Sequence, residues 1–133
     1  MINNLIQAYK NTKYKVFNPN LVIEIGVINN DLNDLMGKNN ASEWAYITAF
    51  NPYSKALTEI ENKDRHLQLK EVTKSFFTYE GHGVGTDSSW EPELSLLVIG
   101  ISKAEAILIG KKFEQNAIVY GKIDSTPELL ILV

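Results

Sequence analysis

Arg65 is the residue of this sequence best suited to bind an anion. Residues 59–75 are expected to form a helix, and at 100° per residue one stripe of it contains Arg65 and four other residues. These are Asn62, Leu69, Val72 and Phe76. Because the three apolar members are expected to face the protein interior, Asn62 and Arg65 are expected to point inward as well.

An inward arginine requires a partner, because an unpaired buried charge is costly. One interpretation is structural, with Arg65 paired to Glu91, Glu93 or a loop carbonyl. The other is functional, with Arg65 binding a ligand carboxylate or phosphate close to a helix N-terminus. The residues alone leave both interpretations open.

Other polar residues lie in segments that interrupt the apolar pattern of the chain. These segments are 51–54, 81–93 and 115–116. Amide, hydroxyl and carboxylate groups can orient a ligand through hydrogen bonds, and an aromatic ring can stack against it. The candidate ligand-binding residues are Asn51, Tyr53, Ser54, Asn62, Arg65, His82, Trp90, Glu93, Gln115 and Asn116.

Motifs for catalysis or cofactor binding are weak. The glycines of Gly81-His82-Gly83-Val84-Gly85 match neither a phosphate-binding loop nor a dinucleotide-binding pattern. His82 is a candidate general base, although a loop histidine is more often solvated, and His66 is expected at the surface. The two histidines lack a metal-ligand spacing and the chain has no cysteine, so neither a metal nor a cofactor is expected.

Two helix-start motifs and several apolar segments indicate the secondary structure. Thr58 with Glu61 and Ser102 with Glu105 form capping boxes, which predict helices over 59–75 and 103–114. Apolar segments predict four core strands, at 44–50, 78–82, 94–99 and 117–120. Shorter patterns predict helices at 3–12 and 32–37 and strands at 21–26 and 129–132.

The order of these elements from 44 to 120 predicts an α+β fold. It is the split βαβ order of ferredoxin-like domains, here with extra N- and C-terminal strands. A doubly wound α/β sheet is the alternative. In the split βαβ path the first two core strands run parallel and the other two run back. Segments 51–54, 81–93 and 115–116 are then expected to meet at one edge of the sheet.

Composition is that of a globular protein. With 133 residues, 44% of them hydrophobic, the chain is expected to form a single domain over 1–133, with its core at 44–121 and a looser part at 1–40. No apolar run has the length of a membrane span and no secretory signal is evident, so a cytoplasmic location is expected. The net charge of −3 and the scattered lysines argue against nucleic-acid binding.

The segment Thr48-Ala49-Phe50-Asn51-Pro52-Tyr53-Ser54 resembles a motif of a small bacterial family known as a domain of unknown function. The resemblance continues through Asn62 and Arg65, through 90–95 and through 110–117, and covers about residues 44–121. Phe50 stands where family members typically carry Trp, and Glu114 where they carry Gly. A glycine-dependent turn at 114 is therefore not expected. The resemblance implies a family and no activity.

Two functional hypotheses follow. The first is binding, with or without turnover, of a small anionic metabolite or nucleotide at this edge of the sheet, with Arg65 as the anion partner. The second is a non-catalytic interaction or structural module in which the same residues tie loops together. A pocket with convergent polar groups favours the first hypothesis, and a large exposed apolar patch favours the second.

Overall fold

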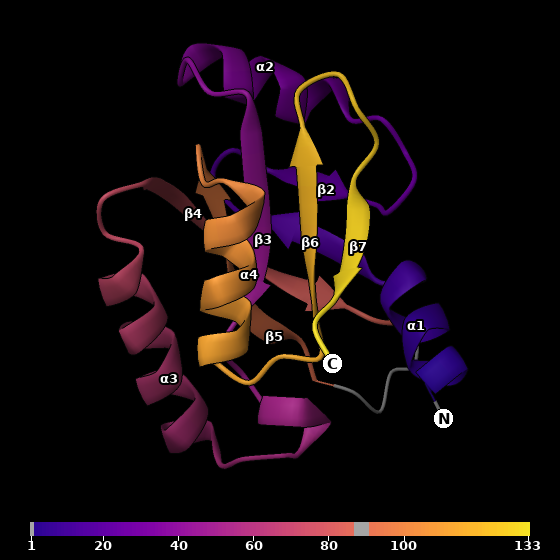
Figure 1. Ribbon diagram of the computed structural model, residues 1–133, viewed down its shortest axis with the longest axis vertical. Coiled ribbons are helices and arrows are strands. Elements are labelled where there is room, and N and C mark those ends of the chain that lie inside the picture. Colours follow the sequence, from indigo (N-terminus) through magenta and orange to yellow (C-terminus); the bar gives the residue numbers. More distant parts are fainter. Residues whose placement is uncertain (1, 87–90) are drawn as a thin grey trace.

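The computed structural model describes residues 2–86 and 91–133. Within them, one sheet has the strand order β2-β1-β4-β5-β3-β6-β7 (Figure 1). Its strands are β1 (Lys13–Val16), β2 (Leu21–Ile23), β3 (Glu43–Thr48), β4 (Phe77–Val84), β5 (Glu93–Ile99), β6 (Ala117–Lys122) and β7 (Glu128–Ile131). The helices are α1 (Ile2–Lys10), α2 (Asn30–Lys38), α3 (Glu59–Val72) and α4 (Lys103–Lys112), with a 3-10 turn, η1, at Pro52–Ser54.

The core of the sheet has the topology predicted from the sequence. Strands β4-β5-β3-β6 follow the ferredoxin-like order, and β3 and β4 run parallel because each pairs antiparallel with β5. The pairs of neighbouring strands are all antiparallel, so the α+β prediction is confirmed and the doubly wound alternative is wrong. Strands β1 and β2 extend the sheet beyond β4, and β7 extends it beyond β6.

Helices α3 and α4 cover one face of the sheet (Figure 1). Both begin with the predicted capping boxes, in which Thr58 and Ser102 accept hydrogen bonds from the backbone three residues on. Successive residues of a strand point to opposite faces, so Ala45 and Ile47 of β3 pack under these helices. Helix α3 ends at Val72, three residues earlier than predicted.

The other face of the sheet is covered by α2 and by β1 and β2, which curl across it. Strand β1 was not predicted, because it has four residues and two of them are lysines. Its side chains alternate, with Tyr14 and Val16 buried. Gly81 lets β1 approach β4, since a Cβ there would lie 1.9 Å from the carbonyl oxygen of Lys15. The Tyr46 hydroxyl donates to that same carbonyl across 2.7 Å.

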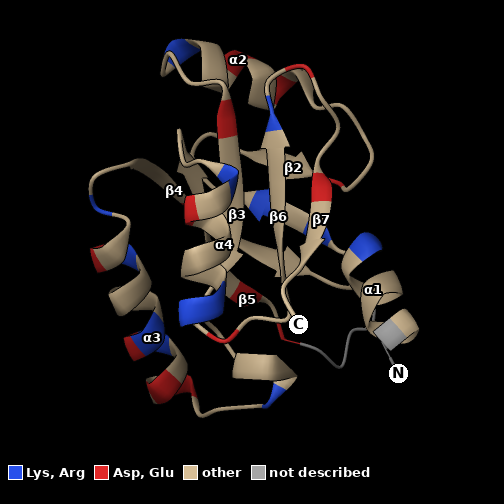
Figure 2. Ribbon diagram, viewed as in Figure 1, with Lys and Arg blue, Asp and Glu red and all other residues tan. Residues whose placement is uncertain are grey.

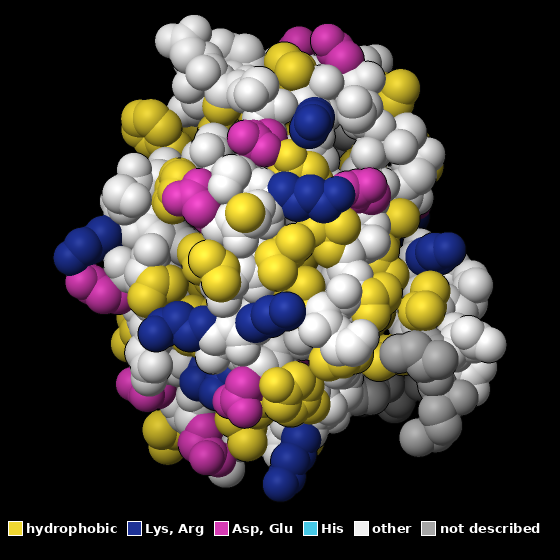
Figure 3. Space-filling view, in the orientation of Figure 1, with side chains coloured by type: hydrophobic (Ala, Val, Ile, Leu, Met, Phe, Trp, Pro, Cys, Tyr) yellow, Lys and Arg dark blue, Asp and Glu magenta, His cyan; other side chains and the backbone are white. Residues whose placement is uncertain are grey.

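Charged side chains of both signs are spread over the elements and over the helical face of the molecule (Figures 2 and 3). On α3, for example, Lys63 pairs with Glu59 at 2.9 Å. None of the described helices is long and apolar enough to cross a membrane. The expectation that Val72 of α3 faces the interior is wrong, because the residue is 39% exposed.

Candidate functional site

Described residues of the three polar segments, 51–54, 81–93 and 115–116, lie together at the end of the sheet that is lowest in Figure 1. Asn51 follows β3 and pairs reciprocally with Asn62 in the second turn of α3. The Asn51 backbone N–H donates to Asn62 Oδ1 across 2.9 Å, and Asn62 Nδ2 donates to Asn51 Oδ1 across 2.8 Å. Asn62 is buried, so this pair fixes the turn between β3 and α3.

The same asparagine reaches the start of β5. Asn51 Nδ2 donates to Glu93 Oε2 across 2.7 Å. Backbone φ is positive at Asn51 (47°), Tyr53 (51°) and Ser54 (62°), in the left-handed region that costs a residue with a side chain about 1–2 kcal/mol. A concentration of such residues requires the surrounding contacts to hold them, and the Asn51 amide supplies three of these contacts.

Arg65 binds acceptors of the protein itself. Its Nε donates to the Ala49 carbonyl across 2.6 Å and its Nη2 to the Phe113 carbonyl across 2.5 Å. Its Nη1 lies 3.5 Å from Glu114 Oε1. All three nitrogens therefore have partners at the end of β3 and the end of α4, which supports the structural interpretation that the sequence left open.

The turn after α4 corrects the expectation for residue 114. Glu114 has φ of 57°, its N–H donates to Lys111, and the N–H of Gln115 donates to Gly110. This is the Schellman arrangement, whose left-handed position is usually glycine. The glycine-type turn is thus present although the residue is Glu114.

Gln115 and Asn116 join the same cluster from the start of β6. Gln115 is buried, and its Nε2 donates to the carbonyls of Phe50 and Phe113. Asn116 Nδ2 donates to Ser54 Oγ across 2.9 Å. Together these contacts link the turn after β3 to the turn after α4.

The side chains of two other candidate residues, Tyr53 and His82, lie outside the hydrogen bonds of this cluster. Tyr53 is 54% exposed. His82 points to another part of the surface, where its ring meets Phe17 edge-on, and partial burial lowers the pKa of its imidazole. Trp90 lies outside the described residues.

His66 was expected at the surface, and that expectation is wrong. The side chain is buried, its Nε2 lies 2.8 Å from Glu80 Oε1, and the ring meets Phe50 edge-on. The hydrogen bond to His66 lowers the pKa of the Glu80 carboxyl. The buried stripe of α3 consists of Asn62, His66 and Leu69, so His66 belongs to it and Val72 does not.

A cavity of about 310 Å³ opens beside this cluster, on the side of the sheet away from α3 and α4. Its wall is made by α1, the middle strands and the turn after β3. Tyrosine rings and aliphatic side chains form much of the surface, including Tyr9, Tyr14, Tyr46, Leu5, Ala117, Val119 and Leu129. The polar lining residues include Asn51, Ser54, Glu93, Ser95 and Gln115.

Glu93 contributes a carboxyl group with a perturbed pKa to the cavity. Burial raises the pKa of its carboxyl above the usual value, and the hydrogen bond from Asn51 offsets part of that effect. Burial also raises the pKa of the Tyr14 and Tyr46 phenols. A carboxyl group that is hard to ionise, beside aromatic rings in a cavity, is the type of environment found at binding and catalytic sites.

The cavity contains residues that the sequence did not indicate. Tyr46 and Thr48 alternate along β3 and face the cavity, but the continuous apolar pattern of this segment conceals the alternation. Tyr9 and Tyr14 belong to the part of the chain that was expected to be a looser addition to the core. The signal that could have found Tyr14 is the alternation of polar and apolar residues in Lys13-Tyr14-Lys15-Val16.

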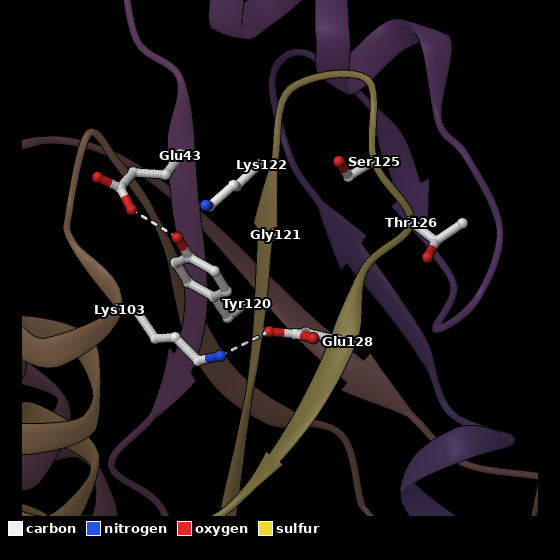
Figure 4. Close-up of a pocket in the computed structure, with 8 residues that line it drawn as sticks. All are labelled: Glu43, Lys103, Tyr120, Gly121, Lys122, Ser125, Thr126 and Glu128. Carbon is white, nitrogen blue, oxygen red and sulfur yellow. Dashed lines mark hydrogen bonds and ion pairs between the residues drawn. The ribbon is translucent and has the colours of Figure 1, made fainter.

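A second hollow, of about 420 Å³, lies at the opposite end of the sheet beside α4 (Figure 4). Its charged groups are largely paired: Tyr120 donates to Glu43 Oε1, and Lys103 lies 3.2 Å from Glu128. Burial, with the hydrogen bond to Glu43, raises the pKa of Tyr120 to about 12. The Lys103–Glu128 pair is half exposed, which marks this hollow as a surface feature.

Among residues 2–86 and 91–133, no group of three or more histidine, aspartate or glutamate side chains is arranged to hold a metal ion.

Comparison with known proteins gives one match. The model of the family described as "Protein of unknown function (DUF3293)" matches residues 47–118, more than half of the chain. This range runs from β3 to the start of β6 and contains Asn51, Asn62, Arg65 and Glu93. No curated protein and no solved structure matches the chain.

Proposed function

The chain belongs to the DUF3293 family, and we propose that it binds a small organic molecule in the cavity between α1 and the sheet. The observation that carries the proposal is the cavity itself, with tyrosine rings and aliphatic side chains around Glu93, Asn51 and Ser95. Its volume of about 310 Å³ is at the lower end of the range typical of ligand sites, roughly 300–1,000 Å³.

The anionic metabolite or nucleotide suggested by the sequence depended on Arg65 as the anion partner. Arg65 donates instead to the carbonyls of Ala49 and Phe113, on the helical side of the sheet. The proposal therefore places the ligand over the opposite side and assigns Arg65, Asn62 and Gln115 to holding the cavity wall in place.

The interaction-module alternative draws on exposed apolar side chains of α3. Ile60 is 82% exposed and Leu67 is 63% exposed. They are two helical turns apart, and the charged residues Lys63 and Asp64 lie between them. Isolated apolar side chains are normal on a protein surface, so ligand binding in the cavity is the function that the geometry supports best.

A fragment screen by ligand-observed NMR tests the proposal. It compares the wild type with a variant whose cavity is blocked and with a control variant. Ala8 of α1 is exposed at the cavity wall, so Ala8→Trp is expected to fill the opening without straining the core. Ala104 of α4 is also exposed but lies away from the cavity, and Ala104→Trp serves as the control. Fragments are expected to bind the wild type and Ala104→Trp and to lose binding to Ala8→Trp. A screen without hits on the wild type, or equal binding to Ala8→Trp, would contradict the proposal.

A further inference from the structure

We infer that the cavity selects an organic ammonium ion, with the positive nitrogen beside Glu93 and the tyrosine rings and a hydrocarbon body along the aliphatic wall. This inference rests on the proposed function, because it names the chemical class of the ligand for the same cavity.

Charge is the first argument. The ionisable acids that line the cavity are Glu91 and Glu93, and no lysine, arginine or histidine lines it within the part of the chain that the structure describes. Glu93 has no ion-pair partner among those residues, and its carboxylate is held by the neutral amide of Asn51. A partly buried carboxylate without a cation is costly, and a ligand cation beside it would offset that cost.

The ionisation of Glu93 points the same way. Burial of Glu93 disfavours its negative charge and so raises the pKa of its carboxyl. A bound ammonium would favour the ionised form and lower that pKa. An anionic ligand would disfavour it further, and would find no positive side chain among the described lining residues.

The tyrosines supply the second argument. The Tyr14 hydroxyl donates to the Tyr9 carbonyl across 2.7 Å, and the Tyr46 hydroxyl donates to the Lys15 carbonyl across 2.7 Å. Because these protons are used within the protein, Tyr14 and Tyr46 line the cavity without a hydroxyl proton to donate into it. The two rings meet edge-on with centroids 5.4 Å apart.

Aromatic rings that surround a cavity attract cations through their negative faces, and such cages recognise alkylated ammonium groups. Here Tyr9 adds a third ring beside Tyr14 and Tyr46, and Glu93 adds a formal negative charge. Leu5, Val119 and Leu129 lie along the same cavity and suit the hydrocarbon part of an amine. The carboxylate and the rings thus match the ammonium group, and the aliphatic wall matches the hydrocarbon body, of one amphipathic ligand.

Three probes of nearly equal size separate the ligand classes. They are 2-phenylethylamine, which is a cation, 2-phenylethanol, which is neutral, and phenylacetate, which is an anion. Each is titrated at neutral pH into the ¹⁵N-labelled wild-type chain, and the shifts of Tyr46 and Ser95 amides report occupancy of the cavity. The amine is expected to bind at least about tenfold more tightly than the alcohol, and the alcohol more tightly than the anion, which corresponds to about 1.4 kcal/mol for the first step.

Two variants locate the preference. Glu93→Gln keeps the shape of the side chain and is expected to remove the tenfold preference for the amine. Glu128→Gln makes the same change in net charge at the second hollow and is expected to leave the preference unchanged. The ranking of the three probes on the wild type stands as a test even if Glu93→Gln does not fold.

The outcomes separate this inference from the proposed function. If the three probes bind the cavity equally, or the anion binds best, the ammonium inference is overturned and the proposed function stands. If 2-phenylethylamine does not bind while fragments of the wider screen do, the result is the same. If neither these probes nor any fragment binds in the cavity, both are overturned.

Discussion

The Asn51 side chain joins Glu93 at the cavity to Asn62 on the far side of the sheet. Its Nδ2 lies 2.7 Å from Glu93 Oε2, and its Oδ1 accepts from Asn62 Nδ2 and from the backbone N–H of Leu57. One amide group therefore orients the cavity carboxyl and closes the turn that leads into α3. Asn51 makes these contacts from a left-handed backbone conformation, with φ of 47°.

Replacement of Asn51 by Ala is expected to lower the free energy of unfolding by about 3 kcal/mol, because it removes several hydrogen bonds and keeps an unfavourable backbone. Asn51→Gly removes the same bonds but suits the left-handed conformation, so its loss is expected to be about 1 kcal/mol smaller. Urea unfolding of both variants measures the difference. Equal losses would contradict the strain that we assign to this position.

Arg65→Met is expected to lower the free energy of unfolding by about 3 kcal/mol, since the Ala49 and Phe113 carbonyls lose charged donors. Lys63→Met, on the exposed side of the same helix, is the control and is expected to change stability by less than about 0.5 kcal/mol. Urea denaturation measures both. An Arg65→Met protein as stable as the wild type would contradict the structural role and return Arg65 to the list of candidate anion-binding residues.

Glu114→Gly is expected to stabilise the protein by about 0.5–1 kcal/mol, because glycine accepts the left-handed backbone of the Schellman turn at low cost. The gain is reduced by the lost contact with Arg65, which is weak because Glu114 is half exposed. Glu114→Ala loses that contact and keeps the strain, so it is expected to be less stable than both. Thermal melts that rank Ala above Gly would show that the turn is not strained.

The stability of the protein is expected to depend on the ionisation of Glu93. Because burial raises the pKa of this carboxyl in the folded state, the folded state binds its proton more tightly than the unfolded state does. Its contribution to stability is present at low pH and declines as pH rises from the usual glutamate value of 4.5 through the raised one.

Glu93→Gln removes that titration, so the stability of the variant relative to the wild type is expected to increase over the pH range from 4.5 up through the raised pKa of Glu93. The contribution of Glu80, whose pKa is lowered, changes in the opposite direction but is the same in both proteins. Denaturation curves at several pH values give the difference directly. A constant difference across this range would show that burial does not perturb Glu93.

The topology and the meeting of the polar segments could be predicted because both depend on local signals. Capping boxes at Thr58 and Ser102 and long apolar strands define the split βαβ order, and that order places 51–54 beside 115–116. The partners of Arg65 could not be predicted, because a backbone carbonyl leaves no mark in the sequence. The turn at 114 was not expected because the residue there is Glu rather than Gly, yet its backbone adopts the left-handed conformation of that turn.

The cavity between α1 and the sheet could not be predicted from the sequence. Its walls combine α1 and β1 with β5 and β6, which lie far away along the chain, and no local pattern shows that these elements meet. The apolar spacing of α3 also predicted the wrong buried face. His66 is buried and hydrogen-bonded to Glu80, whereas Val72 is exposed. A polar side chain can be buried when a residue distant in the sequence forms a hydrogen bond with it, and apolar spacing alone does not predict such a position.

A crystal structure of the chain soaked with the tightest-binding fragment tests the central claim most directly. Binding in the cavity predicts electron density for the fragment between the Tyr46 ring and the Glu93 carboxylate, with the Asn51–Glu93 hydrogen bond retained. Density for the fragment only at the outer surface, with α1 packed down to close the space over Tyr46, would contradict it.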